Sequence, residues 1–244
     1  MRTLPLAALC AATLAPAAWA GEGQVDQAEM LDVERCAIEV ELQNIYLPAS
    51  NGDDSAWKFA PTFEYGASDT VSVGLEIEFE KQGNERLVFE GFGLQAKWVA
   101  VDPDNAPLGL GVQTSLNMDR HGRIGSETYL IAQTLAEDTS LTANLIYVTE
   151  PGDWSEDAFS YVLRADRELS SAISLGAEAG GEISGEYKGR HWIGPILTLS
   201  PAAGDEGKDK EQGSAIPAME FGIFAPLSAK TPDVQFRLEL DWEF

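Results

Sequence analysis

Apolar and polar residues alternate strictly at the end of this chain. Every second residue from Val234 to Phe244 is apolar, and all the residues between them are polar or charged. Successive side chains of a β-strand point to opposite faces, so this segment predicts a strand with one apolar and one charged face. Its length matches the roughly 9–11 residues of a tilted strand that crosses a membrane.

The same two-residue period recurs along most of the chain. It is clear at residues 71–80, 108–119, 159–166 and 173–180, and at 219–227, where Phe224 interrupts the polar side. Small or charged residues hold the second face of these segments. A strand in a soluble core can show the same period, but its repetition favours a transmembrane barrel over a soluble sandwich or a lipocalin-like barrel.

Turn residues divide the chain into about twelve strands, an even number as in bacterial single-chain barrels. The fold class predicted is therefore all-β, a transmembrane antiparallel up-and-down β-barrel. The expected strands cover residues 36–47, 56–67, 70–81, 86–101, 107–118, 125–136, 140–150, 157–168, 171–183, 188–200, 215–227 and 233–244. The connection 201–214 is long where strict alternation predicts a short turn, so ten or fourteen strands remain alternatives. Segments 125–136 and 188–200 have mixed faces.

The first twenty residues are typical of an export signal. A basic start at Met1-Arg2 precedes an apolar run over residues 4–15, and Ala18-Trp19-Ala20 matches the pattern that signal peptidase cleaves. We therefore expect a signal peptide at 1–20, a polar periplasmic N-terminal tail at 21–34 and the barrel at 35–244.

The charge balance excludes one large class of partner. The chain has 16 Lys and Arg residues against 40 Asp and Glu residues, a formal net charge of −24. Such a charge repels phosphate backbones, so nucleic acid is not expected as a partner.

The sequence offers little for catalysis or metal binding. It contains two Cys and two His residues, and His121 and His191 lie in no recognisable nucleophile motif. The acidic clusters lack the spacing of a calcium loop. We predict no enzyme activity, no catalytic residue, no metal site and no cofactor.

Two groups of residues follow from the alternation. If the charged face points inward, the pore-lining residues are Glu76, Glu78, Lys97, Gln113, Arg164, Glu178, Arg237, Glu239 and Asp241. The apolar row of the last strand, ending on an aromatic residue, is expected to be the assembly signal for insertion: Phe236, Leu238, Leu240, Trp242 and Phe244.

Several strand and turn motifs resemble the outer-membrane family named for the MetA pathway of phenol degradation. The motifs are Phe63-Glu64-Tyr65-Gly66, Asp69, Val73-Gly74-Leu75, residues 93–98, Leu108-Gly109-Leu110-Gly111, Asn144-Leu145 and Phe244. The acidic insertion 204–213 and the missing proline-glycine loop after Leu116 depart from the family's pattern. The resemblance implies a barrel that passes small compounds, hydrophobic ones included.

The predicted function is a passive outer-membrane channel or transporter for small solutes. Its expected partners are outer-membrane lipids, the barrel-assembly machinery and a solute that the sequence does not identify. Two alternatives stay open: a plugged structural or interaction barrel in the outer membrane, and a soluble periplasmic ligand-binding β-barrel.

Overall fold

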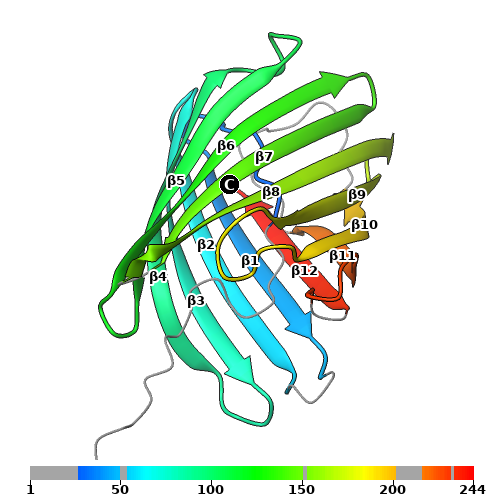
Figure 1. Ribbon diagram of the computed structural model, residues 1–244. Coiled ribbons are helices and arrows are strands. Elements are labelled where there is room, and N and C mark those ends of the chain that lie inside the picture. The colour runs from blue at the N-terminus through cyan, green and yellow to red at the C-terminus, as the bar shows by residue number, and fades with distance from the viewer. Residues whose placement is uncertain (1–26, 50–53, 151–152, 202–215, 232–233) are drawn as a thin grey trace, which may run out of the picture.

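The protein is an antiparallel β-barrel (Figure 1). The computed structural model describes residues 27–49, 54–150, 153–201, 216–231 and 234–244, and these form twelve strands that close in sequence order, with β1 beside β12. The all-β, up-and-down barrel predicted from the sequence is confirmed. The strands are β1 (Ile38–Leu47), β2 (Ala56–Ser68), β3 (Val71–Gln82), β4 (Val88–Val101), β5 (Gly109–Asp119), β6 (Ile124–Ala136), β7 (Thr139–Glu150), β8 (Asp153–Ser170), β9 (Ile173–Glu182), β10 (His191–Leu199), β11 (Ala218–Pro226) and β12 (Gln235–Glu243).

The two faces of the barrel wall are inverted relative to a soluble protein. Leu94 and Leu116 lie opposite each other on β4 and β5, and their side chains are 58% and 61% exposed on the outer face. Charged and amide side chains such as Lys97 and Gln113 are buried on the inner face. Exposed large aliphatic residues and buried polar ones are what a barrel in lipid requires. Among the described residues, no helix is long and apolar enough to cross a membrane.

Main-chain hydrogen bonds between the first and last strands close the barrel. The amide of Ile38 donates to the carbonyl of Phe244 at 3.1 Å, and the amide of Phe244 donates to Ile38 at 2.9 Å. We call this the terminal end of the barrel. Two-residue turns join the strands there at 69–70, 137–138 and 171–172, while the β9–β10 loop at 183–190 lies at the opposite end.

Several strand boundaries differ from the prediction by one to four residues, and two of these differences have a clear cause. β8 begins at Asp153 rather than at 157, because Glu150 and Asp153 still pair after a register shift in β7. β10 begins at His191 rather than at 188, because Gly185 and Gly189 turn the chain with φ angles of 90° and 89°. Such positive φ angles favour glycine and interrupt a strand.

The position of the N-terminal tail also differs from the prediction. The sequence predicted a periplasmic tail over 21–34, but residues 27–34, which we call the lumen segment, lie inside the barrel against the inner wall (Figure 1). The sequence does not reveal this, because the segment is held by main-chain contacts and has no periodic pattern. The rest of the tail and the predicted signal peptide at 1–20 lie outside the described residues, as does 202–215 of the long connection.

A tight turn joins the lumen segment to β1. Cys36 adopts a φ of 67°, and its amide donates to the carbonyl of Gly66 on β2 at 2.8 Å. The carbonyl of Glu34 lies so close to Gly66 that a Cβ there would collide with it. Gly66 therefore leaves the space through which the chain passes from the wall into the lumen.

The lumen segment also explains the strands with mixed faces. Ile131 on β6 points inward and is buried with Leu31 and Val99. Trp192 on β10 and Phe224 on β11 point inward and form a cluster around Ala28. These apolar positions on the inner face are the places where the wall packs against the lumen segment.

Candidate functional site

A cavity of about 580 Å³ runs beside the lumen segment. Leu135 and Asp138, near the terminal end, line it, and so do Thr149 and Tyr187, near the opposite end. Seventeen Asp and Glu residues and three basic residues are among the described residues of its lining. The lumen is therefore strongly acidic.

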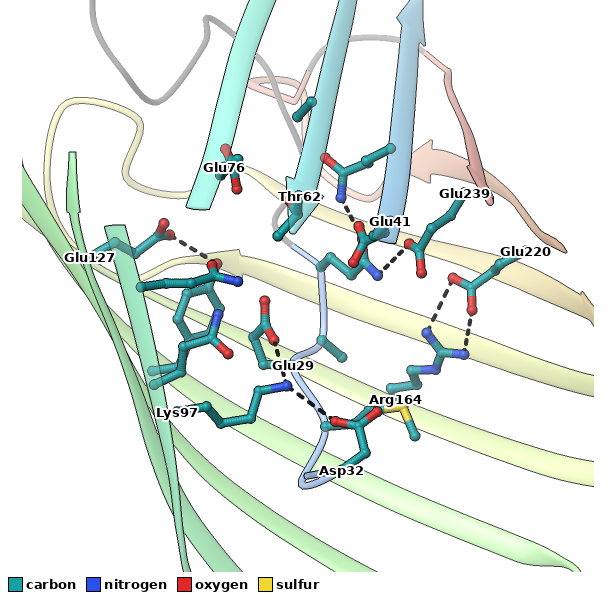
Figure 2. Close-up of a pocket in the computed structure, with 18 of the residues that line it drawn as sticks. Glu29, Asp32, Glu41, Thr62, Glu76, Lys97, Glu127, Arg164, Glu220 and Glu239 are labelled. Carbon is teal, nitrogen blue, oxygen red and sulfur yellow. Dashed lines mark hydrogen bonds and ion pairs between the residues drawn. The ribbon is translucent and has the colours of Figure 1, made fainter. Parts of the chain in front are cut away.

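Three carboxylates that have no basic partner at salt-bridge distance among the described residues define what we call the acidic wall. Glu41 on β1, Glu76 on β3 and Glu239 on β12 line the cavity and are labelled in Figure 2. Glu239 accepts a hydrogen bond from the side-chain amide of Gln27 in the lumen segment at 2.5 Å, and Gln27 in turn accepts one from Gln43. The alternation with outward apolar residues places each of these carboxylates on the inner face.

A ladder of ion pairs lines the inner faces of β8, β9, β11 and β12. Arg164 on β8 binds Asp166 at 2.7 Å and Glu220 at 2.6 Å. Arg237 on β12 binds Glu220 at 3.1 Å and Glu178 at 3.0 Å. The side chains of Arg237 and Glu178 are fully buried, so this ladder is a structural part of the wall.

Lys97 on β4 holds a second charged cluster, which includes the lumen segment (Figure 2). Its ammonium group lies 3.1 Å from Asp32 and 3.9 Å from both Glu29 and Glu64. Burial raises the pKa of Glu29 to about 7, although Lys97 opposes this shift. Three carboxylates thus share one buried cation.

The structure brings most of the predicted pore-lining residues to this cavity. Seven line it directly: Glu76, Glu78, Lys97, Gln113, Arg164, Glu239 and Asp241. The other two, Glu178 and Arg237, point inward but are sealed in the ion-pair ladder. The predicted assembly-signal residues lie on the opposite, outer face of β12, where Phe236 is 42% exposed and Phe244, just past the strand, is 60% exposed.

The residue list drawn from the sequence missed several inward residues. Lys58 binds Glu78 at 2.6 Å, and Glu220 sits between two arginines. Both alternate with outward apolar residues, so the period of the strands was a sufficient signal for them. Glu29 and Asp32 had no such signal, because they belong to a segment without regular structure.

The histidines have ordinary structural partners. His121 lies in the β5–β6 connection, and its main-chain amide donates to Asp119 Oδ1 at 2.8 Å. The ring of His191 lies 3.3 Å from the hydroxyl of Tyr161. Among the described residues, no three His, Cys, Asp or Glu side chains are grouped to hold a metal ion.

Comparisons with known proteins identify the fold. No family model matches this sequence, and no curated protein sequence matches it. The structure is similar to an outer membrane channel from Pseudomonas putida F1, with a TM-score of 0.58 and 11% identity over 90% of this chain and 99% of that one. It is also similar to the KdgM porin, with a TM-score of 0.54 and 12% identity over 84% of this chain and 98% of that one. The same porin in complex with disordered oligogalacturonate gives a TM-score of 0.53. The chain therefore has the fold of outer-membrane β-barrels.

Proposed function

We propose that this protein is an outer-membrane channel for small solutes and that it favours cations. The observation that carries this proposal is the acidic cavity, whose lining includes residues near both ends of the barrel. Rings of Asp and Glu attract cations and reject anions, so the acidic wall sets the sign of the preference. It also disfavours an acidic sugar chain of the kind bound in the KdgM complex.

The apolar outer face of the barrel supports a location in the outer membrane. Leucines such as Leu94 and Leu116 form an exposed apolar surface that lipid covers and water does not favour. This speaks against the soluble periplasmic barrel. The export signal at 1–20 completes the proposal, and N-terminal sequencing of the mature protein should start at Gly21. The assignment to the family named for the MetA pathway is likewise proposed, on the motifs given above.

Reconstitution in planar bilayers tests the channel. Under a salt gradient, the full-length protein should conduct with a reversal potential of the sign that cation preference requires. Glu41→Gln and Glu76→Gln should each lower the ratio of cation to anion permeability. Glu85→Gln, in the exposed turn after β3, is the matched control and should leave the ratio unchanged. Anion preference would refute the selectivity.

The plugged structural barrel is the second candidate. The lumen segment and the ion-pair ladder both fill space inside the barrel, and this observation favours it. The channel would be refuted, and the plugged barrel supported, if the wild-type chain conducts at no voltage and a variant whose lumen segment is displaced does not conduct either.

A further inference from the structure

We infer that the inner wall carries a peptide-binding site, that the lumen segment occupies it as a tethered ligand, and that a free peptide of the same sequence binds there in trans. The peptide site itself depends only on the contacts below. Its consequence, that the bound segment partly blocks the channel, rests on the proposed function.

The site recognises the peptide main chain. The side chain of Asn144 on β7 accepts a hydrogen bond from the main-chain amide of Glu29 at 2.7 Å. It also donates one to the main-chain carbonyl of the same residue at 3.0 Å. Gln133 on β6 accepts a hydrogen bond from the main-chain amide of Leu31 at 3.0 Å, and Glu178 on β9 accepts one from the main-chain amide of Ala28 at 3.3 Å. These bonds come from three strands to one extended stretch, which is how proteins bind peptides in a fixed register.

Two apolar contact sites on the inner wall, which we call seats, determine which side chains of the peptide fit. Leu31 is buried against Val99 and Ile131, and its methyl groups occupy the space that a Cβ at Gly111 would need. Ala28 is buried in the cluster that contains Ile146, Val162, Trp192 and Phe224. Only a small side chain fits the second seat, because large residues surround it. The ligand class is therefore an extended peptide with a small apolar residue followed three positions later by leucine.

A charge adds to this specificity. Asp32 follows Leu31 directly and binds the buried ammonium group of Lys97 at 3.1 Å. Met30, between the two seats, lines the cavity and belongs to neither apolar cluster. The side chains at 28, 31 and 32 thus determine binding, whereas position 30 tolerates substitution.

The covalent link to the barrel is short and separate from these contacts. β1 pairs with β12 on one side and with β2 on the other, so it stays in the wall whether or not the segment is seated. The segment joins it through the turn at Cys36, at the terminal end. It can therefore leave its site without unpairing a strand, which makes it an exchangeable blocker.

The test uses the full-length chain with Leu31→Glu, which puts a charge in the apolar seat and should displace the segment. Its single-channel conductance should rise severalfold over wild type. A synthetic peptide of residues 27–35 should bind this variant, as seen by fluorescence anisotropy of a labelled copy, and restore the low conductance when it is added on the side of the terminal end only. Met30→Glu is the matched control, with the same charge on the same segment: its segment should stay in the site, so the labelled peptide should not bind this variant.

Specificity is checked on both partners. A peptide carrying Leu31→Glu should not bind. Asn144→Ala combined with Leu31→Glu should weaken binding of the wild-type peptide by about tenfold, since two main-chain hydrogen bonds are lost. Asn144→Ala alone provides a second route if Leu31→Glu does not insert, because its looser segment should open frequently in single-channel records.

The outcomes separate the two claims. Peptide binding without any conductance would support the peptide site and refute the channel. The inference would be overturned if Leu31→Glu and Asn144→Ala each conduct at the wild-type level and the wild-type peptide does not bind. That outcome would leave the proposed channel function unaffected. Equal binding of the wild-type and Leu31→Glu peptides would also overturn it.

Discussion

Arg237 and Glu178 form an ion pair at 3.0 Å in which neither side chain is exposed at all. Glu220 adds a second carboxylate to the guanidinium group, and the ring of Phe224 lies 4.8 Å from it. The pair links β12 to β9 across the lumen. It therefore ties the last strand of the barrel to a strand that is not its neighbour.

Removing one member of this pair should be strongly destabilising. Glu178→Ala leaves a buried guanidinium group with one carboxylate fewer, and such losses cost about 3–5 kcal/mol. Urea unfolding in lipid vesicles measures the change. Glu90→Ala, which breaks the more exposed pair with Arg120, is the control and should cost at most about 1 kcal/mol. Similar losses in both variants would contradict a structural role for the buried pair.

A new charge should destabilise the barrel much more on the outer face of a strand than on its inner face. Leu116→Arg places the charge on the outer face of β5, where a charge near the middle of the bilayer costs about 2–4 kcal/mol. Ser115→Arg places it in the cavity, among carboxylates, and should cost far less. Folding yield and unfolding in vesicles compare the two neighbours. A larger loss for Ser115→Arg would mean that the faces are inverted.

The C-terminal residue should govern insertion. Phe244 is 60% exposed on the outer face and pairs with Ile38 through its main chain, so a substitution changes its side chain without removing the closing bonds. We expect Phe244→Asp to accumulate in the periplasm and be degraded, because the barrel-assembly machinery no longer receives the aromatic end. Glu243→Gln is the control. Cell fractionation checks both, and normal insertion of Phe244→Asp would show that the signal lies elsewhere.

Seating of the lumen segment should weaken as the pH rises. Burial raises the pKa of Glu29 from its ordinary 4.5 to about 7, so the seated segment keeps a proton that the released segment gives up between these values. The contribution of Glu29 to seating is therefore largest below pH 4.5, falls up to about pH 7 and is constant above that value. Single-channel open probability from pH 4 to 8 measures this.

Glu29→Gln separates this effect from other titrations in the lumen. Lys97, Asp32, Glu64 and Gln113 surround Glu29 and are present in both chains. The variant should lose the part of the pH response that lies between 4.5 and 7 while keeping the rest. Identical profiles for the two chains would show that Glu29 does not control seating.

The alternation of apolar and polar residues was enough to predict the barrel and which of its faces is apolar. Strand side chains alternate between two faces, so the rows ending at Phe244 and around Leu116 predicted the strands, their number and their outward residues without any knowledge of neighbours. Lys58 and Glu220 could also have been found in this way. Local period and turn chemistry suffice for such features, because each strand carries its own signal.

What fills the lumen could not be predicted before the strands were assembled into the barrel. The site of the lumen segment combines Asn144, Gln133 and Lys97, which come from three different strands. Asn144 and Gln133 bind main-chain atoms that every sequence shares, and Lys97 binds the carboxylate of Asp32. Glu178, a partner of Arg237, likewise lies 59 residues away in the chain, on a strand that does not neighbour β12. Contacts of this kind depend on closure and register, and no pattern in a single segment encodes them.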